Sequence, residues 1–332
     1  MTILVTGGSG YIGSHMVHEL ADAGEPVIVL DDLSTGFRSA LPKSVPLIVG
    51  NVGDETLVGE LLRAHAVSAI IHFAASIVVP DSVREPLRYY HNNTGNARAL
   101  LQSAVDHGVR HFIFSSTAAV YGNPASVPVS EDAPLQPMSP YGRSKLMSEL
   151  ILRDTSAAHR LKYVVLRYFN VAGADPKLRT GQSTVGATHL IKAAVETVLG
   201  LRPRLDVFGN DYPTPDGTCI RDYIHVTDLV RAHSVALAHL RSGGDNRIFN
   251  CGYGRGYSVL EVIEAVKRVS GRDLATRLAE RRPGDPAAIV ADAARIRAEL
   301  GWRPEFDDLD AIVGHALGWE RRLIEARRAG TA

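Results

Sequence analysis

Two side chains near the middle of the sequence have the types and the spacing of an acid–base pair. Tyr141 and Lys145 lie four residues apart in Ser-Pro-Tyr-Gly-Arg-Ser-Lys, so on a helix they share one face. An unperturbed phenol loses its proton only near pH ~10. A fixed ammonium beside it favours the phenolate, which would let the tyrosine act as a general base. Because this spacing also arises by chance in many helices, the prediction needs a redox cofactor site elsewhere in the chain.

A glycine-rich loop at the start of the chain supplies such a site. Residues 3–5 have the apolar character of a buried strand, and Thr-Gly-Gly-Ser-Gly-Tyr-Ile-Gly follows at 6–13, before a helical stretch. Gly8, Gly10 and Gly13 match the G-x-G-x-x-G spacing, which lets the backbone approach a pyrophosphate closely. The free N–H groups of the helix N-terminus then face that anion.

An acidic pair stands where a dinucleotide ribose would lie. The second expected strand, 26–31, ends in Asp31 and Asp32, about 20 residues beyond the glycines. A carboxylate there binds a ribose hydroxyl and repels a 2′-phosphate, so the sequence predicts NAD rather than NADP. An ordinary glycine turn would not require this strand–loop–helix–strand context.

The composition excludes several classes of partner. The 332 residues include 36 basic and 36 acidic ones, so we expect no binding to nucleic acid or to an anionic membrane. Two cysteines, Cys219 and Cys251, form no metal or redox motif and are typical of a reducing compartment. The longest apolar stretch, 66–80, is too short to span a bilayer. We therefore expect a cytoplasmic protein without a metal site.

Strand-like and helical segments alternate through the first half of the chain. This alternation predicts an α/β fold, with a doubly wound parallel sheet and helices on both faces. Right-handed crossovers bring the carboxyl ends of the strands to one edge, where ligands bind. The expected strands are 2–6, 26–31, 45–49, 69–73, 110–115 and 162–167, and the expected helices are 12–23, 54–65, 86–107 and 141–158.

The character of the chain changes after Asn170, where glycine, proline and polar residues become frequent. We expect a dinucleotide-binding domain of residues 1–170, to which about 221–250 return. A smaller, discontinuous α/β domain of about 171–220 plus 251–332 would bind the substrate. The helices expected in this half are 187–199, 227–240, 258–269 and 292–299.

Further motifs join the glycine loop and Tyr-x-x-x-Lys in one pattern. They are Leu-Asp-Asp-Leu-Ser at 30–34, His-Phe-Ala-Ala at 72–75, Phe-Ser-Ser-Thr at 114–117, Val-Tyr-Gly at 120–122, Arg-Tyr-Phe-Asn at 167–170, Val-Phe-Gly-Asn-Asp-Tyr at 207–212 and Asp-Gly-Thr-Cys-Ile-Arg-Asp-Tyr-Ile-His-Val at 216–226. Together they resemble the UDP-glucose 4-epimerase family of the extended short-chain dehydrogenase/reductase superfamily, over residues 2 to about 304. The resemblance implies a Rossmann fold and an NAD-dependent isomerase of galactose and carbohydrate metabolism, acting on a UDP-sugar.

The resemblance also implies a reaction. Tyr141 would take the proton of the sugar 4-hydroxyl while hydride passes from C4 to tightly bound NAD. The 4-keto sugar would then turn over and receive the hydride on its other face, which interconverts UDP-galactose and UDP-glucose. Lys145 would bond the nicotinamide ribose and, with the positive nicotinamide, lower the pKa of Tyr141. Thr117 would hydrogen-bond the 4-oxygen.

Binding residues follow from the same resemblance. The cofactor residues are Gly7, Gly10, Tyr11, Ile12 and Gly13 at the pyrophosphate, Asp31, Asp32, Leu33, Ser34, Thr35 and Gly36 at the adenosine ribose, Asn51 and Val52 at the adenine, and Phe73, Ala74, Ala75, Asn92, Lys145 and Phe169 along the groove. The substrate residues are Thr117, Tyr141, Asn170, His189, Arg221, Arg282 and Asp285. Arginine suits a diphosphate because its fork of donors is permanently charged.

Four positions depart from the family pattern. Thr117 replaces a frequent serine and keeps the hydroxyl, while Ile77 stands where a lysine is common. His189 aligns with an asparagine, and Ile289 with a tyrosine of the sugar pocket. The smaller Ile289 could admit an N-acetyl group, so these departures affect the sugar specificity and leave the reaction type intact.

Several other functions remain open. A 4,6-dehydratase would place an acid after Thr117, where Ala118 and Ala119 stand. A decarboxylase or uronic-acid epimerase would need a pocket for a sugar carboxylate, for which no motif is evident. An epimerase for UDP-N-acetylhexosamine or for UDP-xylose and UDP-arabinose would use the same catalytic residues. A non-catalytic NAD-binding regulator is disfavoured because Tyr141 and Lys145 are both present.

We also expect a homodimer. In the family, the helices expected at 86–107 and 141–158 pair across a two-fold axis as a four-helix bundle. The apolar residues that would exceed the needs of the sheet are Leu100, Leu101, Leu146, Leu150 and Ile151.

Overall fold

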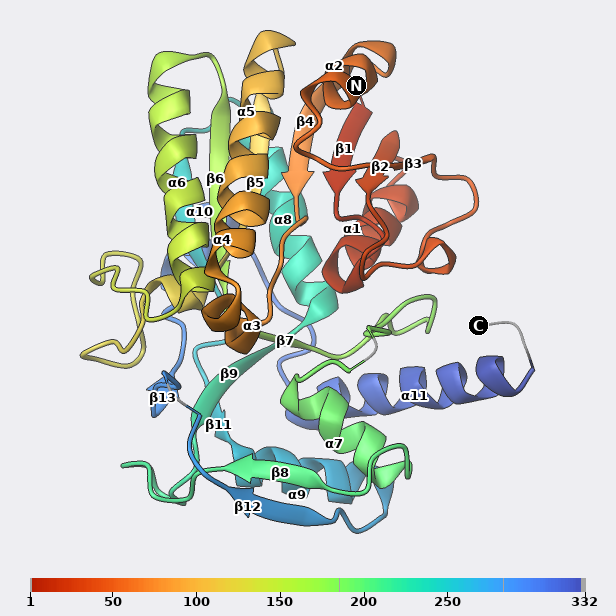
Figure 1. Ribbon diagram of the computed structural model, residues 1–332, viewed down its shortest axis with the longest axis vertical. Helices are drawn as coiled ribbons and strands as arrows, with labels where there is room; N and C mark the ends of the chain where they lie inside the picture. The colour runs from red at the N-terminus through yellow and green to blue at the C-terminus, as the bar shows by residue number, and fades with distance from the viewer. Residues whose placement is uncertain (1, 185, 283, 330–332) are drawn as a thin grey trace.

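A seven-stranded parallel sheet fills the upper half of the molecule in Figure 1 and confirms the doubly wound α/β fold. The computed structural model describes residues 2–184, 186–282 and 284–329. The strand order is β10-β6-β5-β4-β1-β2-β3, which reverses between β1 and β4, the kind of switch point where such sheets bind ligands. The strands are β1 (Thr2–Thr6), β2 (Val27–Asp31), β3 (Leu47–Val49), β4 (Val67–His72), β5 (His111–Thr117), β6 (Lys162–Tyr168) and β10 (Arg247–Cys251).

Helices cover both faces of this sheet because its strands are apolar on both sides. One face packs on α1 (Tyr11–Asp22) and α8 (Val226–Arg241). The other packs on α2 (Glu55–Ala64), α5 (Asn96–Asp106) and α6 (Pro140–Ala158). The expected strands, and the helices 12–23, 54–65, 141–158 and 227–240, lie within about two residues of these bounds.

The start of α6 fixes the position of Tyr141. Ser139 caps the helix by accepting a hydrogen bond from Gly142 N, and Pro140 has the backbone angle suited to the first helical position. Tyr141 therefore lies in the first turn of α6, next to the carboxyl end of β5. Tyr141 and Lys145 are both buried, as expected for two residues on one inward-facing stripe.

The helix expected at 86–107 is interrupted, which corrects the prediction of a single element. It consists of α4 (Pro86–Tyr89), a π-helical segment η2 (Tyr90–Gly95) and α5. A π-turn adds a residue to the turn and is often found at functional sites. Here it turns the buried Asn93 toward the loop after β4, where Asn93 Oδ1 accepts from Ser76 N at 2.8 Å.

The lower part of the molecule is built on two small sheets. Strand β9 (Ile220–His225) pairs with β7 (Asn170–Ala172), β11 (Gly256–Ser258) and β13 (Ala288–Ile289). A two-stranded ladder joins β8 (Leu205–Phe208) and β12 (Thr276–Ala279). The helices are α7 (Leu190–Val198), α9 (Val259–Ser270), α10 (Ala294–Leu300) and α11 (Leu309–Arg328).

One part of the expected return to the large sheet was wrong. Residues 247–251 do join it, as β10 beside β6, and α8 packs on it. Residues 220–225 instead form the centre of the small four-stranded sheet. The chain therefore passes from the small sheet through α8 to the large one, which links the two parts closely.

The remaining elements are short connections. They are η1 (Arg38–Ala40), α3 (Val79–Arg84) and η3 (Ala118–Val120). Among the described residues, no helix is long and apolar enough to cross a membrane.

Candidate active site

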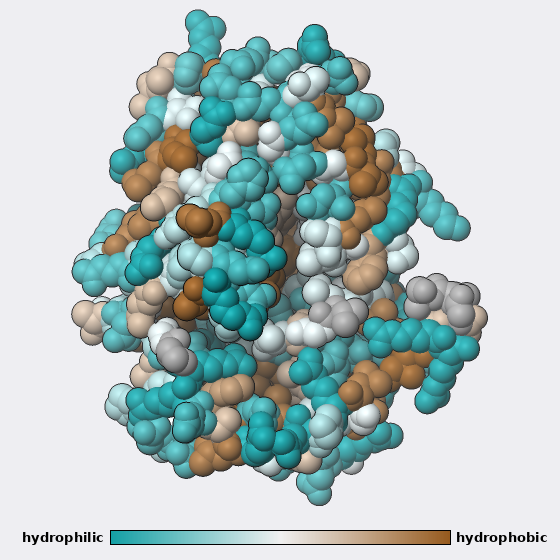
Figure 2. Space-filling model, viewed as in Figure 1, coloured by the Kyte–Doolittle hydropathy of each residue, from teal (hydrophilic) through white to brown (hydrophobic). Residues whose placement is uncertain are grey.

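The glycine loop lies at the switch point, against the loop that follows β4. Gly7 has a positive φ of 68°, and a Cβ built on it would lie 2.6 Å from Ala74 N. A Cβ on Gly13 would lie 2.1 Å from Gly7 O, so a side chain at either position would force the backbone to shift. Figure 2 shows the surface hollowed near the centre of the view, below the carboxyl ends of β1 and β4. This hollow is a candidate groove for a dinucleotide.

Asp31 joins the glycine loop to the end of β2. Its Oδ2 accepts from Ser9 N at 2.8 Å, and its Oδ1 accepts from Leu33 N at 2.8 Å. Burial raises the pKa of this carboxyl, while the two backbone N–H groups oppose the shift. Each oxygen accepts one N–H and keeps a lone pair for a further donor. These acceptors fit the hydroxyl groups of a ribose, and the adjoining backbone cradle, which a Cβ would fill, fits the pyrophosphate of NAD.

The other expected adenosine residues surround the same place. A Cβ on Gly36 would lie 2.7 Å from the backbone carbon of Ser9, so the turn after Asp31 packs against the glycine loop. Asn51 is exposed with its Oδ1 accepting from Gly53 N at 2.7 Å, and Val52 is buried. The turn residues Asp32, Ser34 and Thr35 are exposed.

Tyr141 and Thr117 face each other across the gap between α6 and β5. The Thr117 hydroxyl lies near enough to the Tyr141 phenol to lower its pKa, and Thr117 Oγ1 accepts from Ala119 N at 3.2 Å. That backbone bond occupies a lone pair of Oγ1 and leaves its proton free for the phenol. The fold therefore brings two of the three expected catalytic side chains close together.

The pKa of Tyr141 differs from the expectation. Burial raises the pKa of the phenol to about 12, and the Thr117 hydroxyl only partly opposes this effect. The phenolate loses hydration in the interior, and that cost outweighs the favourable contacts the protein itself provides. The Tyr141–Lys145 spacing alone therefore does not produce a low phenol pKa.

Lys145 lies deep between α6 and the sheet. Its Nζ is 4.6 Å from the centre of the Phe114 ring. Burial lowers the pKa of the ammonium to about 8, and the nearby carboxylate of Glu149 raises it again. His72, whose Nδ1 is 2.7 Å from Thr6 Oγ1, stays neutral because burial, assisted by the charge of Lys145, lowers its pKa to about 3.

The π-helical segment contains two asparagines with different environments. The expected cofactor residue Asn92 is half-buried and donates to Ser76 Oγ at 2.9 Å. Its neighbour Asn93 is buried and donates to both Ser76 O and Ser144 Oγ. Asn93 was not predicted, since only the π-turn directs it toward the helix that carries Lys145.

The expected diphosphate residues converge from separate segments. Arg221 Nη2 lies 3.7 Å from Asp285 Oδ1, and the Arg282 guanidinium lies 3.8 Å from the centre of the Phe208 ring. Arg221 therefore pairs with Asp285 and not with its neighbour Asp222. Two cations and an aromatic face placed together suit a nucleoside diphosphate.

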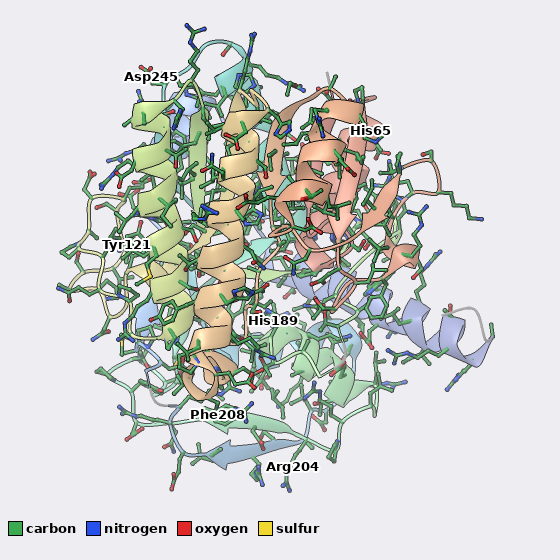
Figure 3. The ribbon with its side chains drawn as sticks, turned by 45° about the horizontal axis from the view of Figure 1, so that its top comes forward. His65, Tyr121, His189, Arg204, Phe208 and Asp245 are labelled. Atoms are coloured by element: carbon green, nitrogen blue, oxygen red, sulfur yellow. The ribbon has the colours of Figure 1, made fainter. Side chains whose placement is uncertain are left out.

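A small cavity of about 30 Å³ lies between Tyr11 at the start of α1, the small sheet and α7. Its lining includes the expected substrate residues Asn170 and His189, together with Tyr11 and Tyr223. Figure 3 shows His189 at the boundary between the large sheet and the lower part. Its Nδ1 is buried without a hydrogen-bond partner, so it is available to a ligand.

Two of the departures from the family pattern, Ile289 and Ile77, lie in different environments. Ile289 is buried in an apolar cluster with Ala118 and Phe169, next to the strand end that carries Thr117. Ile77 is half exposed and follows the loop after β4. The first could therefore affect the sugar pocket directly, whereas the second borders the cofactor groove.

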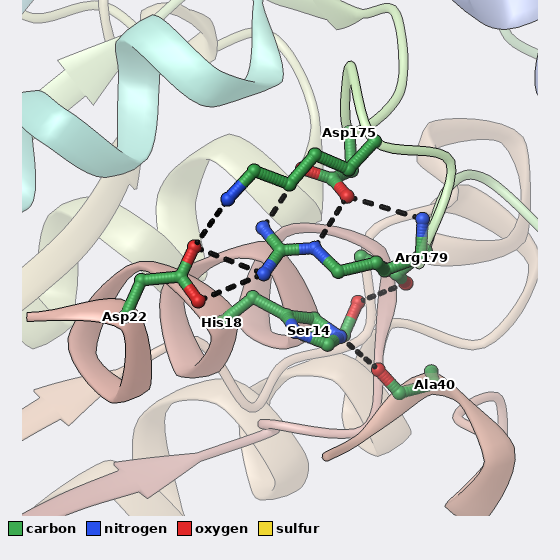
Figure 4. A network of polar contacts seen from close by, with 8 residues as sticks. Ser14, His18, Asp22, Ala40, Asp175 and Arg179 are labelled. Carbon is green, nitrogen blue, oxygen red and sulfur yellow. Dashed lines mark hydrogen bonds and ion pairs between the residues drawn. The ribbon is translucent and has the colours of Figure 1, made fainter. Parts of the chain in front are cut away.

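A polar network ties the segment after β7 to α1 (Figure 4). Arg179 bonds both Asp175 and Asp22, and the Ser14 and Thr180 hydroxyls lie 2.7 Å apart. Tyr11 OH donates to Gly173 O at 2.8 Å. The helix that would present its N-terminus to the pyrophosphate is thus held by the lower part of the molecule.

Comparisons with known proteins match this geometry to one family. The family model described as the NAD dependent epimerase/dehydratase family matches residues 3–252. A UDP-glucose 4-epimerase of Azospirillum brasilense is 59% identical over 98% of this chain and 93% of its own length.

Solved structures give the same result. A UDP-glucose 4-epimerase of Brucella ovis in complex with NAD has a TM-score of 0.93 at 43% identity, covering 96% of this chain and 97% of its own. The UDP-Glc/GlcNAc 4-epimerase of Campylobacter jejuni has a TM-score of 0.85 at 47% identity, covering 97% and 99%. This chain belongs to the NAD-dependent epimerase/dehydratase family.

Proposed function

We propose that this protein is an NAD-dependent isomerase that interconverts UDP-galactose and UDP-glucose. The observation that carries the proposal is the Thr117 hydroxyl close to the Tyr141 phenol at the strand edge, beside a glycine cradle and Asp31. The 59% identity to a UDP-glucose 4-epimerase over nearly the whole chain supports the same reaction. NAD, when bound, accepts a hydride from the sugar C4 and returns it.

Different residues of this chain would bind the cofactor and the substrate. The glycine loop and the N-terminus of α1 would hold the pyrophosphate, and Asp31 the adenosine ribose. Arg221, Arg282 and Asp285 would hold the UDP part of the substrate. These contacts would place the sugar 4-hydroxyl at Tyr141 and Thr117.

Proton transfer would run through Tyr141. Its phenolate would take the proton of the 4-hydroxyl, and the same phenol would give it back after the 4-keto sugar has turned over. Thr117, oriented by Ala119 N, would donate to the 4-oxygen. Because burial alone raises the pKa of Tyr141 to about 12, deprotonation requires positive charge nearby, which Lys145 and a bound nicotinamide would provide.

A second substrate is favoured by one observation. Ile289 lies in the cluster with Phe169 and Ala118, where the family often has the larger tyrosine. A smaller side chain there leaves room for an N-acetyl group, and a relative at 47% identity is described as acting on both Glc and GlcNAc forms. We therefore propose UDP-N-acetylhexosamine as an additional substrate class.

We also propose a homodimer through the expected helices, with a different set of apolar residues except for Leu150. Leu100 and Leu101 are buried within the chain's own core, which corrects that part of the prediction. Leu146 and Ile151 pack against intrachain clusters. The exposed apolar residues of α3, α4 and α6 are Val79, Val83, Leu87, Met147 and Leu150, and Figure 2 shows apolar surface over the helices at its upper left.

The division into domains and the location stay proposals of the same kind. We propose that residues 1–170 with 226–251 hold NAD and that the rest of the chain holds the UDP-sugar. A cytoplasmic location agrees with two cysteines that are both buried and free.

The test of function uses the purified protein without added cofactor. We expect bound NAD in the released nucleotide fraction, and conversion of UDP-galactose to UDP-glucose measured by chromatography. A parallel assay with UDP-N-acetylgalactosamine and UDP-arabinopyranose tests the range of sugars. Bound NAD without turnover of any of these would favour the non-catalytic regulator.

A further inference from the structure

A buried carboxylate continues the catalytic face of α6. Glu149 follows Lys145 by four residues and Tyr141 by eight, so the three share one stripe of the helix. Its side chain is only 4% exposed. No residue of the proposed mechanism uses it, and a buried acid is rare unless it is paired.

Two neighbouring strands hold this carboxylate in place. Ser116 Oγ donates to Glu149 Oε1, and Arg167 Nη2 donates to Glu149 Oε2 at 2.7 Å. Arg167 Nε adds bonds of 3.2 and 3.3 Å to the two oxygens. Ser116 precedes Thr117 on β5, so the carboxylate fixes α6 against the strand that carries Thr117.

The network extends beyond the carboxylate. Arg167 Nη1 donates to Tyr121 OH at 3.1 Å and to Glu131 O at 3.3 Å. Tyr121 OH donates in turn to Asn250 Oδ1 at 2.6 Å. All three nitrogens of the guanidinium therefore donate hydrogen bonds, and Glu149 cannot rotate without breaking several of them.

Lys145 faces few charged groups. Glu149 is on its own helix, His72 on β4 is neutral with a pKa of about 3, and Arg167 on β6 is paired with Glu149. Tyr141 is a phenol whose pKa is raised by burial, and Phe114 presents a ring face. Glu149 is thus the group whose negative charge offsets the burial of the ammonium.

We propose that Glu149 is a positioning residue for the reaction, whose clamped carboxylate holds α6 against β5 and places a negative charge one helical turn from Lys145. The proposal rests on the proposed epimerase function for its effect on turnover. Its effect on Lys145 can be measured independently of any activity.

The direct test measures the pH at which Lys145 loses its proton. The chain has six lysines, so the NAD-loaded protein labelled with ¹³C at the lysine ε-carbon gives a simple spectrum, with Lys145 assigned by its loss in Lys145→Arg. We expect Lys145 to titrate about one pH unit lower in Glu149→Gln than in the unaltered protein. Glu149→Asp, which keeps the charge, and Asp154→Asn, on the exposed side of α6, should leave the titration near its original pH. An unchanged titration in Glu149→Gln overturns the proposal.

Turnover gives a second readout. In Glu149→Gln the alkaline limb of the pH profile of kcat should move to lower pH by about one unit, as the titration of Lys145 does. A purely structural role would not cause this shift. Ser116→Ala removes one hydrogen bond from the carboxylate and keeps the charge. It should lower kcat several-fold, with KM, NAD content and the alkaline limb unchanged.

Ser116→Ala and Glu149→Asp also test the proposal if Glu149→Gln does not fold because Arg167 is left unpaired. Full kcat in Ser116→Ala would then reject the positioning role, and an alkaline limb displaced in Glu149→Asp would reject the charge role. If the protein proves inactive on every UDP-sugar, the proposed function fails while the titration of Lys145 still decides the role of Glu149.

Discussion

The amide nitrogen of Asn93 lies 3.0 Å from Ser144 Oγ and donates a hydrogen bond to it. This bond ties the π-helical segment to α6 one residue before Lys145. The same side chain accepts from Ser76 N at 2.8 Å and donates to Ser76 O at 2.9 Å. Asn93 therefore joins the loop after β4, the interrupted helix and the catalytic helix.

We expect Asn93→Ala to destabilise the protein and slow the reaction. Loss of these bonds leaves partly buried backbone groups of Ser76 without their partners, which costs about 1–3 kcal/mol of the free energy of unfolding. Urea-induced unfolding measures this change, and kcat should fall because Lys145 loses its support. His91→Ala, at an exposed neighbouring position, is the control. A free energy of unfolding for Asn93→Ala within about 0.5 kcal/mol of the unaltered protein would contradict the assignment.

Substitutions of the neighbouring side chains Tyr141 and Thr117 should separate proton transfer from binding. Tyr141→Phe removes the proposed base, so turnover should fall by about 10²- to 10⁴-fold while bound NAD is retained. Thr117→Ala should also slow turnover, whereas Thr117→Ser keeps the hydroxyl and should stay close to the original rate. Rates from UDP-galactose conversion and NAD content from the denatured protein are the measurements. Full turnover in Tyr141→Phe would show that another group is the base.

The large sheet could be predicted because its signals are local. Parallel strands buried on both faces read as short apolar runs, and Gly8, Gly10 and Gly13 mark the first turn. The small strands β8, β9, β11, β12 and β13 could not be predicted in this way, because most have only two to four residues and their pairing depends on distant partners. The helix α11 was missed although Leu309, Ile312, Val313 and Leu317 have helical spacing.

The site was predictable where type and spacing carry the chemistry, as for Tyr141, Lys145 and Asp31. It was not predictable where contacts between distant segments determine the position or the pKa of a side chain. The π-turn that buries Asn93 is supported by Ser76 and Ser144, which lie 17 and 51 residues away. The high pKa of Tyr141 follows from burial by several elements. Sequence spacing indicates that two side chains can lie close together, whereas their protonation depends on how deeply the surrounding residues bury them.

Arg179 should couple the lower part of the molecule to cofactor retention. Its guanidinium bonds the buried Asp175 at 2.7 and 3.0 Å and Asp22 at 2.9 Å, and these ion pairs keep the pKa of both carboxyls below the ordinary value. Arg179→Ala leaves Asp175 unpaired, which should lower the free energy of unfolding by about 1–3 kcal/mol. NAD should also dissociate faster, since the segment 173–180 supports Tyr11 and Ser14.

Thermal unfolding and the NAD retained after gel filtration measure the two effects. Lys177→Ala is the matched control, because Lys177 is mostly exposed and also pairs with Asp22; its effect should stay below about 0.5 kcal/mol. Equal NAD loss in both variants would show that the network does not support the cofactor helix.

Buried histidines should make the protein less stable in mild acid. Burial lowers the pKa of His72 to about 3 and the pKa values of His15 and His233 to about 4, from an ordinary value of 6.5. Between pH 6.5 and about 4 the unfolded chain binds protons that the folded protein does not. The free energy of unfolding therefore falls as the pH falls, by about 1.4 kcal/mol per pH unit for each such proton.

Acids whose pKa is raised by burial work in the opposite direction, and Asp222 is one of them. Burial raises the pKa of Asp222 to about 6, so between that value and its ordinary 3.8 the folded protein binds a proton that the unfolded chain does not. Among the described residues, eight histidines have a pKa lowered by burial and five acids have one raised by it, so the net change should still be destabilising. Urea midpoints at pH 7.5, 6.0 and 5.0 measure the slope. His233→Gln, whose amide can replace the bonds to Ser115 and Leu229 O, should reduce the slope by one proton. A urea midpoint independent of pH would mean that these histidines become protonated without unfolding.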